Sequence, residues 1–150
     1  MNNTSTYWKF ALMIATSALA MYLVMYANVF EFSHVYTATM RIYMTLLMVV
    51  PMILIMLWFM WSMYPNEKKN RTIIFCSILI WVWIFWAIRS QAWIWDVQWM
   101  KAMIPHHSSA ILTSSQADLK DPEVQALAKD IVEAQEKEIA EMKELIERLK

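Results

Sequence analysis

The chain contains no glycine, whereas average usage would give about ten in a protein of 150 residues. Glycine is the residue that adopts positive φ most readily, so its absence disfavours tight turns of that kind. It also excludes the usual glycine-rich phosphate loops. We therefore expect an all-helical protein with short, simple connections. Transmembrane helices usually carry more glycine than soluble ones, so a designed or computationally resampled sequence is a second interpretation.

Other scarcities exclude further classes of protein. The single cysteine, Cys76, lies in an apolar run and cannot form an intrachain disulfide. Acidic and basic residues balance at 13 each, and no basic stripe points to nucleic acid. A di-iron oxidase needs two Glu-x-x-His motifs, but only residues 31–34 have that form. With no Ser-His-Asp set or zinc-ligand spacing either, we expect that the protein is not an enzyme.

Long hydrophobic runs are abundant in the first part of the chain. They cover residues 7–30, 42–64 and 72–88, and residues 92–95 can extend the third run. About 20 apolar residues in a helix cross a hydrocarbon core of ~30 Å. We therefore expect a region of three transmembrane helices over residues 1–92, with the lipid bilayer as its partner.

The basic residues predict an orientation for these helices. Lys68, Lys69 and Arg71 lie between the second and third runs, and Lys9 precedes the first. Loops rich in lysine and arginine remain on the cytoplasmic side. We therefore expect the N-terminus on the cytoplasmic side of the membrane and the C-terminal region on the outer side.

Residues 93–150 have the pattern of an amphipathic helical hairpin. A first helix is expected over residues 93–115, through Pro105, and a turn near Lys120. Asp121 is a suitable N-cap for the second helix, and Pro122 suits its first position. An isolated hairpin of this size needs added support, so we expect a homo-oligomer in which two hairpins complete a four-helix bundle.

Two thioethers and two imidazoles lie within eight residues, at Met100, Met103, His106 and His107. Helical residues three and four apart share a face, and thioether with imidazole suits Cu(I) better than Mg²⁺ or Ca²⁺. Adjacent histidines lie roughly 100° apart around a helix, so one is expected to face a metal and the other a different contact. Methionine is also a common core residue, so simple packing remains an alternative.

The second helix of the hairpin brings further donors to this level. With a turn centred near residue 120 and equal rise per residue, His106 lies opposite residues 134–135. Glu138 and Met142 then come within one turn of the level of Met100 and Met103. These six side chains form the candidate copper site.

The C-terminal region contains the motifs Met103-Ile104-Pro105-His106-His107, Ala110-Ile111, Asp121-Pro122-Glu123-Val124, Gln135, Glu138-Ile139 and Met142. Over residues 96–150 these motifs resemble the domain-of-unknown-function 305 family, and the whole chain resembles the subgroup with preceding membrane helices. The resemblance implies a bacterial inner-membrane protein whose periplasmic hairpin is a ferritin-like helical domain, in a family with members tied to copper binding or tolerance. It carries over Met103, His106, His107 and Met142 as candidate ligands, with Gln135 and Glu138 nearby. Ser108 and Ser114 stand where the family often has Gln and Met.

The sequence thus predicts a membrane-anchored copper-binding protein with its site in the periplasmic hairpin. The alternative is a structural or designed membrane bundle that keeps the motif without metal. Methionines also recur at every fourth residue from Met40 to Met60. Such a row winds around a helix and is expected to pack against neighbouring helices.

Overall fold

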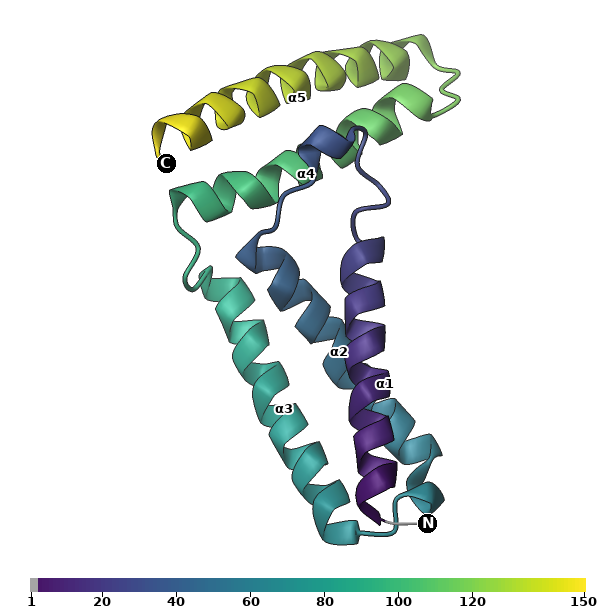
Figure 1. Cartoon of the computed structure of the whole chain (residues 1–150). Helices are drawn as coiled ribbons and strands as arrows, with labels where there is room; N and C mark the ends of the chain where they lie inside the picture. Colours follow the sequence, from purple (N-terminus) through teal and green to yellow (C-terminus); the bar gives the residue numbers. More distant parts are fainter. Residues whose placement is uncertain (1–2) are drawn as a thin grey trace. The chain divides into compact units, whose positions relative to one another are not determined.

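The computed structural model describes residues 3–150, and over that range its regular elements are all helices (Figure 1). The expected all-α class is therefore confirmed. The α-helices are α1 (Asn3–Val24), α2 (Thr39–Phe59), α3 (Glu67–Ser90), α4 (Asp96–Gln116) and α5 (Pro122–Arg148). Two short 3-10 helices, η1 (Phe32–His34) and η2 (Trp61–Met63), lie in the connections after α1 and α2.

The chain forms two compact units. The first comprises the chain up to Val24 with Arg41–Ala92, and the second comprises Met25–Met40 with Trp93–Lys150. Residues 25–40, expected from the sequence to belong to the membrane region, instead form one compact unit with the C-terminal helices. Each unit is described separately below.

The first unit contains three helices long and apolar enough to span a membrane, as expected from the sequence. The spans are Thr6–Val24, Thr39–Phe59 and Glu67–Ser90. The third is longer than the apolar run because the side chain of Asn66 caps it, accepting a hydrogen bond from Lys69 N at 3.0 Å. In the most apolar stretch of each helix, only 6% of the residues are buried in α1, 28% in α2 and 17% in α3. Most of their apolar side chains therefore face outward.

The three helices meet where α1 begins, α2 ends and α3 begins (Figure 1). Phe10, Leu57 and Tyr64 form the buried centre of this cluster. Asn70 is fully buried; its amide donates to the carbonyl of Tyr64 at 2.8 Å and accepts from the hydroxyl of Tyr7 at 2.7 Å. This polar pair therefore fixes the same end of the unit that the apolar cluster fills.

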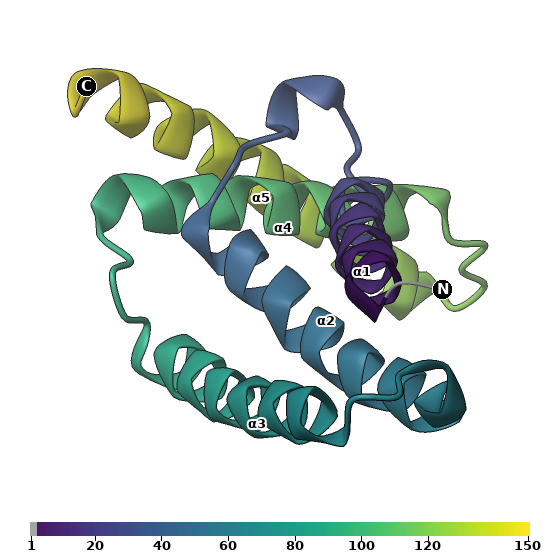
Figure 2. The ribbon, with the colours of Figure 1, turned by 60° about the horizontal axis from the view of Figure 1, so that its bottom comes forward.

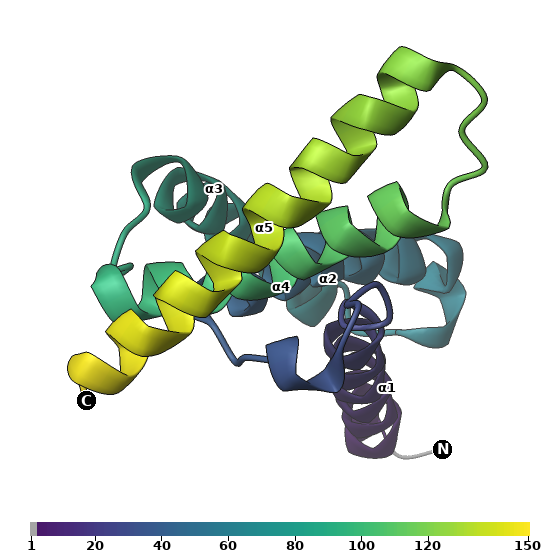
Figure 3. The same cartoon turned by 90° about the horizontal axis from the view of Figure 1, so that it is seen from above.

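In the second unit, α4 and α5 form the expected antiparallel hairpin, and α5 crosses α4 obliquely (Figure 3). Asp121 is the N-cap of α5, since its Oδ1 accepts from Glu123 N at 2.9 Å and Val124 N at 3.1 Å. Helix α4 runs unbroken through the buried Pro105. The buried core of the hairpin consists of Met100, Ile104, Ile111, Ile139, Met142 and Ile146.

The connection between α1 and α2 packs on this hairpin, a contact not expected from the sequence (Figure 2). Tyr36 packs against the hairpin core. The backbone N–H of Phe30 donates to Ser108 Oγ at 2.7 Å, and that of Thr39 donates to Gln98 Oε1 at 3.0 Å. A segment distant in sequence thus gives the hairpin part of the support that it needs.

The connection between α3 and α4 departs from the simple geometry expected of a glycine-free chain. Gln91 and Trp93 have positive φ, at 52° and 56°. Gln91 ends α3 in the left-handed conformation, and the N–H of Ala92 donates back to the carbonyl of Ala87 at 3.0 Å. Left-handed backbone costs a residue with a Cβ about 1–2 kcal/mol, so this connection is formed against local preference.

Candidate metal-binding site

His107 is the centre of the polar contacts between α4 and α5. Its Nδ1 lies 3.0 Å from the carbonyl oxygen of Met103, and its Nε2 lies 2.6 Å from Oε2 of Glu138. A carbonyl oxygen can only accept, so Nδ1 carries a proton and donates it. The side chain of His107 is 10% exposed and that of Glu138 is 52% exposed, so the pair reaches from the hairpin core to its surface.

This arrangement resembles that of histidines in metal sites. A metal-ligating histidine usually donates its second ring N–H to a backbone carbonyl or carboxylate, which fixes the ring and its tautomer. In His107 that role falls to Nδ1 and the carbonyl of Met103. Nε2 is therefore the nitrogen that can offer a lone pair once its contact with Glu138 opens.

Three thioethers lie together in the same hairpin. Met100 and Met142 belong to the buried core, at 4% and 6% exposure, and Met103 packs against that core. The structure therefore brings the three predicted methionines into one cluster and places His107 on the carbonyl of one of them. Burial of this kind serves packing as well as ligation, so the geometry is compatible with both interpretations.

The adjacent histidines have different surroundings, as their positions on a helix require. His106 is exposed, whereas His107 is buried. Their ring centroids are 6.1 Å apart, with 63° between the planes. Of the six predicted ligands, the three methionines share the hairpin core, His107 and Glu138 contact each other, and His106 is exposed.

The register of the hairpin differs from the sequence estimate. With the turn centred at residue 120, His107 should lie opposite residues near 133, but it contacts Glu138, more than one helical turn further along. The backbone is extended at Ala117 and Asp121, with ψ of 136° and 128°, so the two helices are not joined by a tight turn. The oblique crossing of the helices adds to the shift (Figure 3).

Over residues 3–150, no group of three or more His, Cys, Asp or Glu side chains is placed to hold a metal ion. Zinc and other borderline or hard ions are usually held by such groups. A metal at His107 would therefore depend on the thioethers of the hairpin core. That donor set suits a soft ion such as Cu(I).

A second polar cluster, not identified as a site from the sequence, surrounds Ser108. This side chain is fully buried, and its Oγ accepts from the N–H of Phe30 and lies 2.9 Å from Nδ1 of His34. His34 is itself buried, and its Nε2 lies 3.8 Å from Glu31. These contacts attach the α1–α2 connection to α4 directly beside His107.

His34 also lines a cavity of about 240 Å³ between this connection and the hairpin. The charged groups in its wall are Glu31, Glu136 and Lys143. In the sequence, Ser108 was notable only because the resembled family often has glutamine at this position. Glu31 and His34 were notable only as a single Glu-x-x-His motif of the kind found in di-iron proteins. No periodic pattern relates residue 34 to residue 108, so the sequence carried no signal for this contact.

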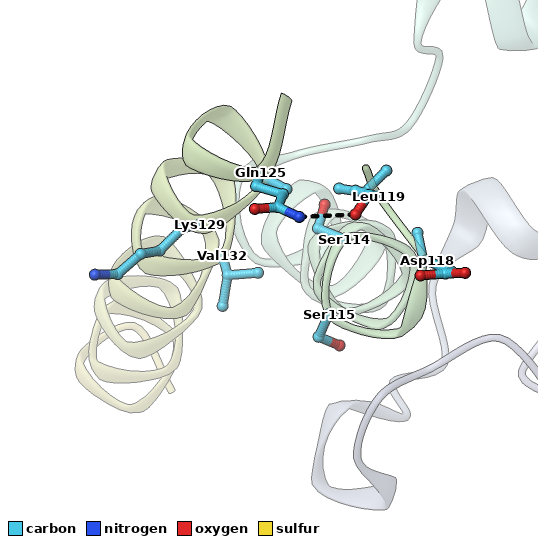
Figure 4. A pocket seen from close by; sticks show the side chains of 9 residues that line it. Ser114, Ser115, Asp118, Leu119, Gln125, Lys129 and Val132 are labelled. Carbon is cyan, nitrogen blue, oxygen red and sulfur yellow. Dashed lines mark hydrogen bonds between the residues drawn. The ribbon is translucent and has the colours of Figure 1, made fainter. Parts of the chain in front are cut away.

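A larger cavity, of about 350 Å³, lies beside the hairpin turn (Figure 4). The amide of Gln125 donates to the carbonyl of Leu119 at 2.8 Å and ties the turn to α5. Asp118 and Lys129 lie on opposite sides and do not point toward each other (Figure 4). The pocket therefore lacks convergent polar groups of the kind that bind ligands.

Comparison with known proteins places the hairpin in a family. The family described as "Domain of unknown function (DUF305)" matches residues 89–146. A curated relative, "Uncharacterized protein L153" of Acanthamoeba polyphaga mimivirus, is 41% identical over 110 residues, which cover 72% of this chain and 70% of the relative. This similarity is longer than the family segment and therefore includes part of the apolar helices. No solved structure matches the chain.

We predict that attachment of the α1–α2 connection weakens as the pH falls. Burial lowers the pKa of His34 below its ordinary 6.5, the charge of Lys143 lowers it further, and Glu31 opposes them. The neutral ring is therefore the attached form. Its stabilising effect is complete above pH 6.5 and is lost as the pH falls below that value. Hydrogen exchange at the Phe30 amide, corrected for intrinsic rates, should show less protection at pH 5.5 than at pH 7.5.

Two variants serve as controls for this measurement. His34→Gln removes the titrating ring and should abolish the pH dependence, whereas His106→Gln changes an exposed ring and should preserve it. Equal protection of the Phe30 amide at both pH values in the parent chain would contradict the prediction.

Proposed function

The chain belongs to the DUF305 family of domains of unknown function, and on this premise we propose that it is a membrane-anchored protein that binds copper in its C-terminal hairpin. The observation that carries the proposal is the geometry of His107. Nδ1 is fixed by the carbonyl of Met103 and Nε2 faces Glu138, while Met100, Met103 and Met142 belong to or pack against the core of the same hairpin. The proposal describes a binding protein, not an enzyme.

In this proposal, His107 supplies the imidazole nitrogen, and Met103, Met142 and Met100 supply thioethers. Glu138 accepts the proton that leaves Nε2 and, being half exposed, can pass it to water. The role of the copper ion in this proposal is to be bound, through its affinity for soft donor atoms. His106 is on the outer side of α4 and would act, if at all, in transfer to or from the site.

The alternative function is a structural membrane bundle without metal. The same methionines fill the hairpin core, and the His107–Glu138 hydrogen bond is complete without an ion. This alternative predicts that the thioether sulfurs have no role beyond volume. Variants that keep the volume and remove the sulfur therefore separate the two functions.

We predict that Met103→Leu and Met142→Leu reduce Cu(I) affinity while nearly preserving stability. Exchange of methionine for leucine conserves volume and usually costs less than about 1.5 kcal/mol. Loss of even an indirect partner at a metal site costs about 10–100-fold in affinity, so each direct ligand should cost at least that. His107→Gln should cause the largest loss. Titration with Cu(I) against a chromophoric competitor, under reducing conditions, measures these affinities.

The matched controls are Met48→Leu and Met52→Leu in α2, together with His34→Gln in the α1–α2 connection. None of these residues belongs to the proposed site, so Cu(I) affinity should be unchanged. If His107→Gln and Met142→Leu bind Cu(I) as tightly as the parent chain, the copper site is wrong and the structural bundle takes its place.

We further propose an orientation in the membrane. Lys68, Lys69 and Arg71, in the first turns of α3, favour a cytoplasmic position for the start of that helix and for the N-terminus. The hairpin then lies on the other side, which is the periplasm for a bacterial inner membrane. The argument depends on loop charge alone and would hold for any membrane that follows the same rule.

We expect a membrane-impermeant maleimide to label position 120 but not position 68 in intact cells. Cys76 is exposed and is first replaced by serine to remove background labelling. Lys68→Cys and Lys120→Cys are then compared before and after the cells are permeabilised. Labelling at 68 and not at 120 in intact cells would show the inverted orientation.

We also propose that the hairpin associates with a second copy of itself. The α1–α2 connection covers part of the hairpin, but Val124 and Leu127 of α5 stay 45% and 59% exposed. Two hairpins would cover such side chains and complete a four-helix bundle.

A matched pair of variants on α5 tests this association. Leu127→Lys places a charge on the exposed side and should shift the detergent-solubilised chain from dimer to monomer without unfolding it. Ile146→Ala empties a site that is 2% exposed and should cost the hairpin about 2–5 kcal/mol of stability. Sedimentation and urea unfolding measure the two effects. A parent chain that is monomeric at every concentration would contradict the association.

A further inference from the structure

A basic cavity lies where α1 and α3 begin, within the first unit. It has a volume of about 410 Å³ and is lined by Tyr7, Lys68, Lys69, Thr72 and Ile73. All of these residues belong to the first unit, at the boundary of two helices that are apolar enough to span a membrane. The cavity therefore lies at the polar end of an apolar surface.

The two ammonium groups of this cavity are not neutralised. The carboxylate of Glu67, the residue before Lys68, forms an ion pair with Arg71 at 3.2 Å. In residues 3–150 no ion pair joins Lys68 or Lys69 to a carboxylate. Lys69 Nζ lies 5.2 Å from the centre of the Tyr7 ring, within the range of a cation–π contact. Two positive charges thus face one concave site.

The wall that carries these charges is held in place by buried hydrogen bonds. The Tyr7 hydroxyl lies 2.7 Å from Asn70 Oδ1, and the fully buried Asn70 in turn donates to the carbonyl of Tyr64. The Tyr7 ring is therefore fixed against the first turns of α3. A site formed in advance loses less conformational entropy when it binds a ligand.

The remaining lining is apolar, and an apolar surface continues along α3. Ile73 and the Tyr7 ring line the cavity, and large apolar side chains further along the helix are exposed, among them Phe75 at 63% and Leu79 at 54%. An amphiphile with an anionic head matches this surface better than a free anion. We propose that the cavity binds the phosphate headgroup of an anionic phospholipid, whose acyl chains lie along α3.

The lipid site depends on the proposed membrane anchoring for its location, but it is independent of copper. Basic residues at a membrane surface attract anionic lipids additively, so loss of both lysines should weaken binding about thirtyfold. The test uses the full, metal-free chain in detergent, titrated with phosphatidylglycerol or phosphatidylcholine and analysed by native mass spectrometry. Phosphatidylglycerol should bind more tightly to the parent chain, and K68Q/K69Q should lose most of that preference.

The charge-matched control is K129Q/K137Q, which removes two exposed lysines from α5 and should bind as the parent does. K68Q alone should give an intermediate loss, which covers the case in which the double variant does not fold. Equal binding of the two lipids, or an unchanged preference in the variants, would overturn the proposal. If inorganic phosphate competes as effectively as phosphatidylglycerol, the cavity binds free phosphate and not a lipid. That result would also contradict the proposal. Failure of the chain to insert into vesicles would instead refute the anchoring.

Discussion

The hydrogen bonds of His107 and Ser108 determine how the second unit is assembled. A buried polar ring is costly unless both of its nitrogens find partners, and His107 finds one on its own helix and one on α5. The next residue, Ser108, performs the same function for the α1–α2 connection. A single turn of α4 therefore holds two other segments of the chain. Apolar contacts supply most of the packing, but these polar contacts specify which residues face each other.

The same pairing sets a condition on any metal that binds there. A hydrogen bond to a charged group contributes about 1.5–3 kcal/mol, and the His107–Glu138 bond must be broken before Nε2 can act as a ligand. An ion held by the imidazole alone would offset little of the free energy lost when this hydrogen bond breaks. The thioethers of Met103 and Met142 must therefore provide the surplus, which makes the proposed site selective for soft ions. The pair also gives both ring nitrogens of His107 a protein partner, so the ring is not left with an unsatisfied buried nitrogen.

Local features of this fold could be predicted from the sequence, and distant contacts could not. The apolar runs gave the three long helices, and Asp121 with Pro122 gave the start of α5, because these signals lie within one helical turn or one span. The partner of His107 was misplaced by more than a turn, since a small change in the connection at residues 117–121 shifts the whole of α5. The contact of His34 with Ser108 was missed entirely, because a hydrogen bond between isolated polar residues leaves no periodic trace. That Met100, Met103 and Met142 share one hairpin core could be predicted, since the hairpin topology fixes their levels approximately.

The absence of glycine also explains the character of the first unit. Membrane helices pack closely when small residues let their backbones approach each other. This chain instead presents tryptophan, phenylalanine and methionine, and most of those side chains face outward along α1, α2 and α3. At one end of the unit Asn70 and Tyr7 add hydrogen bonds to an apolar cluster, and at the other end the Tyr43 hydroxyl donates to the carbonyl of Ala92 after α3. A hydrogen-bonded junction at a polar boundary with large apolar sides suits helices surrounded by lipid, because the bilayer then solvates what the protein does not bury.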